Sequence, residues 1–268
     1  MAQSTKKRYN NNTSAVYITI GIALILIMSI IGTSAFMRAN EIKVEGFSAY
    51  SIDDIVEASG ISLGDNLLFI NVQTVSHNIR RELPFINSAS VTRVLPDKIL
   101  ISITESEAIA KISFAGETLV SDSTGRILAR SSEDSFLQIY GDPNKISTLI
   151  DIRGLEIESV VTGTVFRPVF GSEMKLQYMQ DVLNAVEREG LEKDIQYLDV
   201  SNIVNVHLGY LNKFKVNFGG AANLRQSNLR HNLGRLSETA AWIDTRFPNT
   251  SGTIDMTDAN ADPKFVPD

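Results

Sequence analysis

One long run without charge near the N-terminus constrains the chain most. Ala15–Phe36 reads AVYITIGIALILIMSIIGTSAF, which is 22 residues and about 33 Å long as an α-helix, enough to cross the hydrocarbon core of a bilayer. A cleaved signal peptide has a shorter apolar region, of about 7–15 residues, followed by small residues. Here the run ends at Phe36-Met37-Arg38. The pattern therefore predicts an uncleaved, single transmembrane helix over residues 15–36.

Charge sets the expected orientation of this helix. Lys6, Lys7 and Arg8 give the segment before Arg38 a charge of +3. The net charge of the whole chain is −6, so the remainder carries −9. The basic, polar residues 1–14 are expected to be a disordered cytoplasmic tail, which places residues 38–268 outside the membrane. A body of negative charge argues against a nucleic-acid partner. The absence of cysteine excludes disulfides and thiolate metal sites.

The segment after the anchor has the pattern of a small α+β unit. Residues 41–45 alternate as a strand, Ser51 and Gly60 bound a short helix, and Asn71 and Pro84 bound a second one. Residues 85–110 then form a hairpin around the turn 95–98, in which Ile99, Ile101 and Ile103 share one face. The order β-α-α-β-β predicts a three-stranded sheet that buries both helices on one face.

The rest of the chain is predicted to be a second, mixed α+β unit in which strands outnumber helices. A hairpin is expected over 119–128 with its turn at 122–125, and a loop over 131–147. The further predicted strands are 149–157, 160–166, 195–200, 203–208, 214–218, 252–256 and 264–266. The predicted helices are 173–189 and 224–243.

One motif resembles an enzyme site. Ser172-Glu173-Met174-Lys175 matches the S-x-x-K of penicillin-binding proteins, and Ser121-Asp122-Ser123 imitates their second motif. However, the second motif here precedes the first, and no K-T-G strand follows. Ser172 stands where a helix begins, so it is expected to cap backbone N–H groups. The sequence therefore predicts no catalytic residue.

No metal or cofactor site is expected either. His77, His207 and His231 fall on different predicted elements, without a second ligand at metal spacing. Asp255, Asp258 and Asp262 lack the glycine and bidentate glutamate of a calcium loop. The chain has no phosphate-binding or dinucleotide-binding glycine motif, so no small-molecule substrate is predicted.

The hairpin carries a recognisable pattern of residues. It reads Val91-Thr92-Arg93-Val94-Leu95-Pro96, followed by an alternating strand over residues 98–105. This pattern resembles the V-x-R-x-W-P and L-x-I-x-V-x-E of the FtsQ/DivIB family of bacterial cell-division proteins. Matching segments follow the family's order along the chain: Val44-Glu45-Gly46, Gly64–Leu68, Pro84-Phe85-Ile86, Leu119–Gly125, Phe218-Gly219-Gly220, Thr253–Met256 and Phe265-Val266-Pro267. Leu95 stands where tryptophan is common, and Ser106-Glu107 replaces the usual Arg-x-Pro.

The resemblance implies a POTRA domain at 41–112, a β domain at 113–256, and an acidic loop with a short terminal strand at 257–268. It implies a non-enzymatic scaffold at the division septum. Such a scaffold holds FtsL-like and FtsB/DivIC-like single-span coiled-coil proteins and helps to control septal peptidoglycan synthesis. In the family the last strands of the β domain receive a partner strand. The corresponding residues here are Ile254, Asp255, Met256, Lys264, Phe265 and Val266.

Two other interpretations remain open. A POTRA-bearing binding module of a secretion or spore-envelope assembly would have the same first domain. A membrane-anchored cell-wall serine acyltransferase would use Ser172 and Lys175. Midcell localisation separates the first from a division protein, and the effect of Ser172→Ala separates the second.

Overall fold

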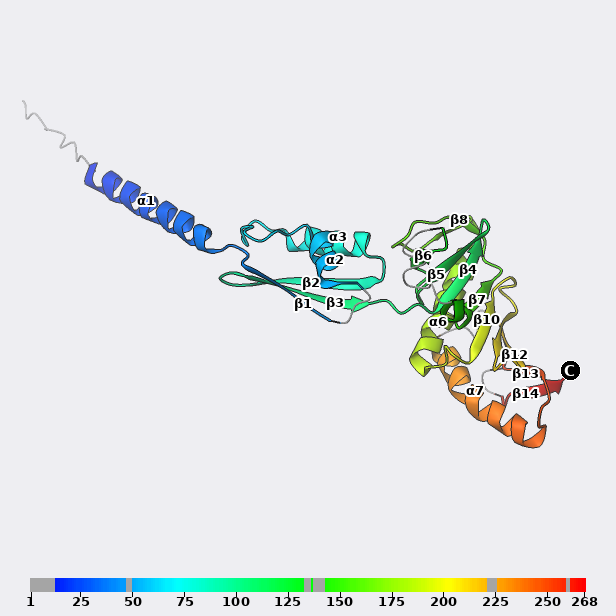
Figure 1. The fold of residues 1–268 in the computed structure, drawn as a ribbon. Coiled ribbons are helices and arrows are strands. Elements are labelled where there is room, and N and C mark those ends of the chain that lie inside the picture. Colours follow the sequence, from blue (N-terminus) through cyan, green and yellow to red (C-terminus); the bar gives the residue numbers. More distant parts are fainter. Residues whose placement is uncertain (1–12, 47–49, 133–135, 137–142, 221–225, 259–260) are drawn as a thin grey trace, which may run out of the picture. The chain divides into compact units, whose positions relative to one another are not determined.

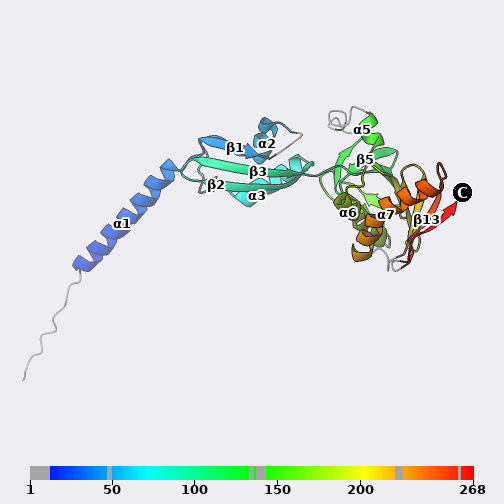
Figure 2. The same ribbon diagram turned by 90° about the horizontal axis from the view of Figure 1, so that it is seen from below.

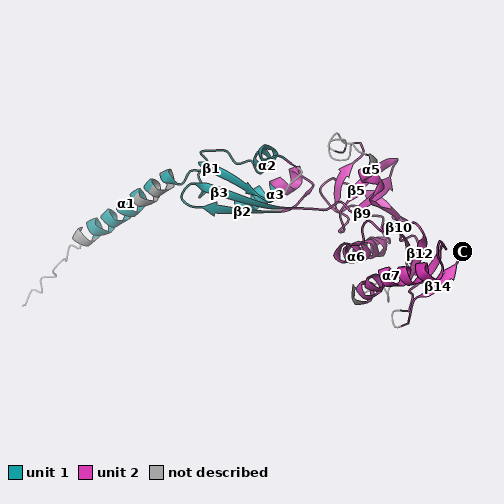
Figure 3. Cartoon of the chain, turned by 60° about the horizontal axis from the view of Figure 1, so that its bottom comes forward, with its two compact units in different colours: residues 1–46, 51–78, 89–103 teal, residues 47–50, 79–88, 104–268 magenta. Residues whose placement is uncertain are grey.

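A computed structural model describes residues 13–46, 50–132, 136, 143–220, 226–258 and 261–268 (Figure 1). The predicted disordered tail therefore lies outside the described residues, except for residues 13 and 14, which belong to the first helix. The chain divides into two compact units (Figure 3). Unit 1 comprises 1–46, 51–78 and 89–103, and unit 2 comprises 47–50, 79–88 and 104–268.

Helix α1, Thr13–Phe36, contains the charge-free run. It carries no acidic residue in its first turn and no basic residue in its last. The side chains described along it, including Ile18, Leu24 and Met28, are exposed. Among the described residues no helix qualifies as long and apolar enough to cross a membrane.

The predicted β-α-α-β-β order is confirmed. Its elements are β1 Glu41–Glu45, α2 Ile52–Ser59, α3 Val72–Glu82, β2 Ile86–Val94 and β3 Lys98–Glu105. The sheet order is β1-β3-β2, with β1 parallel to β3. Figure 1 shows α2 and α3 on one face of the sheet. Ile99 and Ile101 on β3 are fully buried, as their alternation predicts.

Short-range signals set the ends of the helices. Ser51 and Asp54 form a reciprocal capping box at the start of α2, with both hydrogen bonds 3.1 Å long. Gly60 ends α2 in the left-handed conformation, at φ 68°. The Asn71 side chain accepts hydrogen bonds from the N–H groups of Gln73 and Thr74 before α3. The sequence predicted each of these caps.

Unit 2 is built on a nine-stranded sheet of order β14-β13-β12-β11-β10-β7-β4-β5-β6. Its strands are β4 Ala110–Phe114, β5 Glu117–Ser121, β6 Ile127–Arg130, β7 Ile150–Arg153, β10 Ile195–Asp199, β11 Val206–Tyr210, β12 Phe214–Gly219, β13 Gly252–Asp255 and β14 Lys264–Pro267. The short strands β8, Ile157–Ser159, and β9, Arg167–Pro168, pair separately. Helices α6, Glu173–Glu189, and α7, Gln226–Arg246, cover one face (Figures 1 and 2).

The apolar stripes of α6 and α7 fill one core against this sheet. Met179 and Val186 on α6 and Leu233 on α7 are buried in the same cluster as Leu198 and Val216 on the strands. The opposite face differs along the sheet. At β5 and β6 it is covered by a second apolar cluster that includes Val120, Leu128 and Phe136, whereas on β11 and β12 it carries polar side chains such as His207 and Lys215. The observed fold is thus mixed α+β, with an antiparallel strand at its C-terminal edge.

Four predictions in unit 2 were wrong. The predicted strand 149–157 is instead two strands in different sheets, β7 and β8, because Gly154 adopts φ 82° between them. Residues 160–166 are not a strand, because Gly163 adopts φ 84° within a turn. Strand β11 begins at Val206 rather than 203, since the Asn202 side chain accepts from the N–H of Val204 and holds a turn there. The predicted loop 131–147 contains a short helix, α5, at Pro143–Ser147. Strand β4 was not predicted; it spans position 112, where the sequence indicated a boundary.

A buried arginine joins distant segments within unit 2. Arg126 is 6% exposed and donates to three backbone carbonyls, those of Gly163 at 2.8 Å, Ile86 at 3.0 Å and Arg80 at 3.0 Å. Burial lowers the pKa of its guanidinium below the ordinary value, and the nearby Arg80 charge adds to this. Because these carbonyls lie far apart in the sequence, this arginine ties residues 79–88 to the rest of the unit.

Candidate partner-binding edge

The six residues predicted to bind a partner come together at one end of the nine-stranded sheet. Strands β13 and β14 pair antiparallel, with Ile254 opposite Phe265 and Asp255 opposite Lys264. Met256 follows directly after β13, and its N–H donates to the carbonyl of Asn217. The structure therefore places five of the six in two adjacent strands and Met256 directly beside them.

Only β14 of these two strands has an open side. Strand β13 lies between β12 and β14, and the side chains of Ile254 and Met256 are 0% and 2% exposed. Its backbone is paired on both sides, so these residues support the edge without touching an added strand. Strand β14 is the last strand of the sheet, and a partner strand can pair only with its outer side.

The hydrogen-bond pattern shows which groups face outward. The N–H of Asp268 donates to the carbonyl of Ser251, whereas the N–H of Gly252 donates to Lys213 on the β12 side. By alternation, Thr253 and Asp255 pair inward with Val266 and Lys264. The outer side of β14 therefore presents the N–H and C=O of Phe265 and the C=O of Pro267. Proline has no N–H and is tolerated at such an edge.

The side chains of β14 alternate between the core and the open face. The Phe265 ring packs against Phe214 at 6.0 Å and Phe247 at 5.8 Å between ring centroids. Val266, which is 58% exposed, and Lys264 lie on the other face. A Cβ at Gly252 would stand 2.4 Å from the carbonyl of Val266, so a glycine is needed for this close approach. Val266 and Lys264 therefore offer side chains to a partner, whereas Phe265 offers its backbone.

The segment between β13 and β14 is tied to α7. Arg235 forms an ion pair with Asp262, with 2.9 Å between Nη2 and Oδ1, and donates to the carbonyl of Ala261. The buried Asn232 side chain donates to the carbonyl of Met256. These contacts hold the residue after β13 and the residues before β14 against α7, so β14 is positioned without a partner.

The opposite edge of the same sheet is covered where β6 begins. The N–H of Ile127 donates to the carbonyl of Thr164, and the N–H of Gly163 donates to the carbonyl of Ile127. Residues 161–165 therefore occupy the outer side of β6. Within the part of the sheet that the structure describes, β14 is the more accessible edge.

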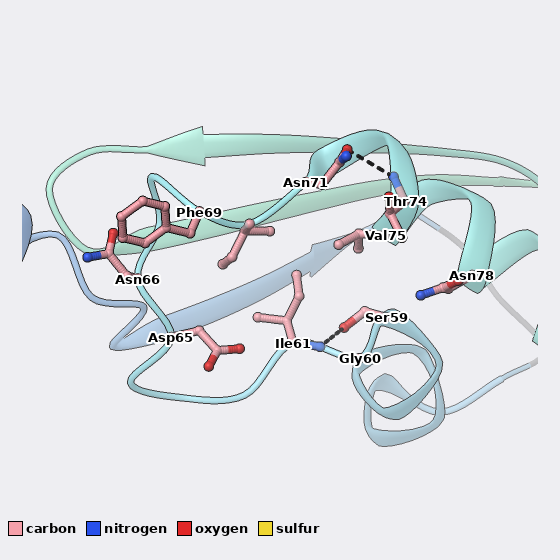
Figure 4. Close-up of a pocket in the computed structure, with 11 residues that line it drawn as sticks. Ser59, Gly60, Ile61, Asp65, Asn66, Phe69, Asn71, Thr74, Val75 and Asn78 are labelled. Carbon is pink, nitrogen blue, oxygen red and sulfur yellow. Dashed lines mark hydrogen bonds between the residues drawn. The ribbon is translucent and has the colours of Figure 1, made fainter.

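Two hollows lie near the described strands. One, of about 430 Å³, is lined by Arg153, Tyr197, Lys215 and Thr253 on the polar face beside β13. The other, of about 390 Å³, is lined by Asp65, Asn66, Phe69, Thr74 and Asn78 in unit 1 (Figure 4). No sequence pattern indicates either hollow, because each is lined by residues from separate elements.

The S-x-x-K motif forms a polar cluster around Glu156. Ser172 occupies the start of α6 but makes no side-chain cap; its hydroxyl donates to Glu156 at 3.2 Å, which corrects the predicted capping role. The Lys175 ammonium pairs with the same carboxylate at 2.5 Å. Hydrogen bonds from Lys175 and Ser172 hold the pKa of Glu156 below its usual value. Ser172 and Lys175 therefore each hydrogen-bond to Glu156, whereas a lysine that activates a serine hydrogen-bonds to that serine.

Ser172→Ala is therefore expected to leave partner binding unchanged. The variant loses one hydrogen bond to an exposed carboxylate, which lowers the free energy of unfolding by about 1 kcal/mol or less. Urea denaturation and a partner pull-down measure the two effects. A folded variant that loses function in cells would favour the acyltransferase interpretation.

The three histidines and the acidic residues near the C-terminus do not gather into a candidate metal site among the described residues. His77 and His231 are exposed on α3 and α7, and His207 lies beside Asp199 and Tyr197 on the open face. Among the described residues no three histidine or acidic side chains are grouped so that they could hold a metal ion. Asp255 accepts from the N–H of Thr257, and Asp262 pairs with Arg235.

Comparison with known proteins decides the nature of the first unit. The family model described as "POTRA domain, FtsQ-type" matches residues 37–106. Those residues are similar to a POTRA domain of the FtsQ type. The match includes β1, α2, α3, β2 and β3, so the FtsQ-type POTRA domain is the three-stranded unit described above.

Curated relatives extend the similarity beyond the POTRA domain. The cell division protein DivIB of Clostridium tetani is 24% identical over 193 residues, covering 70% of this chain and 68% of that protein. The cell division protein FtsQ of Corynebacterium glutamicum is 31% identical over 119 residues, covering 43% of this chain and 53% of that protein. The cell division protein FtsQ of an Anaeromyxobacter species is 24% identical over 204 residues, covering 62% of this chain and 69% of that protein. The resemblance to the FtsQ/DivIB cell-division proteins is confirmed.

Proposed function

We propose that this protein is a non-catalytic scaffold of the division machinery that captures a strand of a partner protein on β14. The observation that carries the proposal is an open, positioned edge strand in a chain with an FtsQ-type POTRA domain. The relatives that it matches are named cell division proteins, which supports a role at the division septum.

The proposal includes a membrane anchor. The charge-free residues 15–36 span the cytoplasmic membrane once, with the basic tail 1–14 in the cytoplasm and the body outside. In place of the predicted boundary at 112, the POTRA domain ends with β3 at Glu105, and the β domain begins with β4 at Ala110 and runs to 256. The acidic loop and terminal strand occupy 257–268. The length of the apolar run and the position of Lys6, Lys7 and Arg8 support this arrangement.

The partner strand comes from FtsL-like or FtsB/DivIC-like single-span coiled-coil proteins. Backbone pairing with Phe265 and Pro267 supplies affinity, while Val266 and Lys264 contribute side-chain selectivity on the open face. By holding these partners in one complex, the protein helps to control septal peptidoglycan synthesis. It does so without catalysis of its own, since Ser172 and Lys175 serve the Glu156 cluster.

A fluorescent fusion of the full-length protein tests the proposed role in dividing cells. We expect the signal to gather at midcell as the septum forms. Uniform staining of the membrane throughout division would contradict the division role and favour a POTRA module of a secretion or spore-envelope assembly.

A further inference from the structure

The end of the POTRA domain next to α1 carries an unusual set of exposed apolar side chains. Leu63, Leu68 and Phe69 are 69%, 48% and 81% exposed, and Val94 and Leu95 are 43% and 56% exposed. They lie on two segments, the loop 62–69 and residues 94–97, which are the last residue of β2 and the turn after it; both are called loops below. Among the described residues of 37–103 in unit 1, Ile52 is the only other exposed large apolar side chain. Single exposed apolar residues are ordinary, but a cluster of this kind marks a contact surface.

Backbone hydrogen bonds hold the first loop against the residues that follow α1. The N–H of Leu67 donates to Met37, the N–H of Ala39 to Asp65, and the N–H of Gly64 to Ala39, each at 2.8 Å. Arg38 and Asn66 form an isolated antiparallel bridge. Figure 4 shows Phe69 and Asn66 at the end of the domain from which this part of the chain emerges.

The second loop is held at the same place. The N–H groups of Asn40 and Glu41 donate to the carbonyl of Asp97, at 2.8 and 3.3 Å. The Arg93 guanidinium also donates to the carbonyl of Ile70 at 2.6 Å, which ties the second loop to the first. Both loops are therefore hydrogen-bonded directly to residues 37–41, which follow the exposed Phe36.

This placement determines what the loops meet once α1 is in a bilayer. Phe36 is the last residue of the apolar helix, so residues 37–41 leave the membrane at the level of the lipid headgroups. The two loops are hydrogen-bonded to those residues and therefore lie close to that level. Apolar side chains at this level gain free energy by entering the boundary between headgroups and acyl chains.

We propose that these two loops form a membrane-contacting rim that rests in the lipid interface around the end of α1. Its members are Phe36, Leu63, Leu68, Phe69, Val94 and Leu95. The charges beside it offset one another, since Lys98 pairs with Glu41 at 2.6 Å, so lipid packing rather than attraction to anionic headgroups drives the contact. The inference rests on the proposed membrane anchor and adds a second attachment to it.

The rim gives the POTRA domain a fixed orientation on the membrane. A single helix followed by a short linker leaves a domain free to tilt and rotate. Contacts from two loops remove part of that freedom before a partner binds, and preorganisation of this kind lowers the entropic cost of association. Partner proteins anchored in the same bilayer then meet the surface of the POTRA domain at a constant distance from the membrane.

Labelling of the full-length protein in vesicles tests the rim. Because the chain contains no cysteine, Leu63→Cys, Phe69→Cys and Leu95→Cys each accept one polarity-sensitive fluorophore at a defined position. Ile52→Cys is the matched control, since Ile52 is 61% exposed and lies at the far end of α2 from the loop. Each variant is reconstituted in vesicles of phosphatidylcholine and phosphatidylglycerol and isolated by flotation.

The rim predicts a blue-shifted emission at positions 63, 69 and 95, quenched by nitroxides carried on the lipids near the headgroups. The label at position 52 should emit as in water and be quenched by iodide. If the variants float with the vesicles but the labels at all four positions emit as in water, the rim is overturned and the anchor stands. A shift that appears only after a partner protein is added would mark a protein-binding surface and overturn the rim. Failure to float with the vesicles would overturn both the anchor and the rim.

Discussion

Deletion of residues 263–268 is expected to abolish capture of the partner strand. The deletion removes β14, whose outer side carries the N–H and C=O of Phe265 and the C=O of Pro267. It also uncovers Phe214 and Phe247, which pack against the Phe265 ring. A pull-down of the coiled-coil division proteins measures the loss, and circular dichroism checks that the truncated chain remains folded. Glu238→Gln, at an exposed position on α7, keeps the strand and serves as the control.

A matched pair of substitutions separates backbone pairing from the loss of the ring. Phe265→Ala and Phe265→Pro both lack the aromatic side chain, but only proline removes the outward N–H. Loss of one donor leaves a carbonyl of the partner unpaired, which costs about 1–3 kcal/mol. We therefore expect Phe265→Pro to bind the partner about tenfold more weakly than Phe265→Ala, or worse. Equal affinities would show that the partner does not pair with this edge.

Arg126→Met is expected to destabilise unit 2 by at least about 3 kcal/mol, because three carbonyls each lose a donor at a cost of about 1–3 kcal/mol. Methionine fills much of the volume but leaves the carbonyls of Arg80, Ile86 and Gly163 without the donors they now have. Urea denaturation of the full-length protein in detergent measures the change.

Arg130→Met, four residues further along the chain, is the control for Arg126→Met. Arg130 pairs with Glu117 at 3.0 Å, and both side chains are partly exposed. Loss of such a pair lowers the free energy of unfolding by about 1 kcal/mol or less. If the two variants were equally stable, the three carbonyl contacts of Arg126 would not contribute as proposed.

Local signals made much of the fold predictable. The capping box at Ser51, the left-handed Gly60 and the helix ending at Gly190 depend on residues within one turn of each other, so the sequence displays them directly. The burial of Ile99 and Ile101 follows from alternation along one strand. These features require no knowledge of distant contacts.

Non-local contacts explain what the sequence did not predict. The acceptors of Arg126 are 37 to 46 residues away, so its pattern resembles that of any surface arginine. Ser172 occupies a capping position, yet its hydroxyl binds Glu156, 16 residues earlier. At the partner-binding edge, alternation identifies which residues share a face. It does not show that Phe265 faces the core of its own chain rather than a partner.

Photocrosslinking from Val266 in dividing cells tests strand capture most directly. Val266 is exposed on β14 and its side chain does not contribute to the aromatic cluster, so a photoreactive residue there leaves the edge intact. Val204, which is 72% exposed in a turn of the same unit, is the control position. The expected result is an adduct with an FtsL-like or FtsB/DivIC-like protein from position 266 and none from position 204. No adduct at 266, or an adduct with a protein unrelated to division, would contradict strand capture at β14.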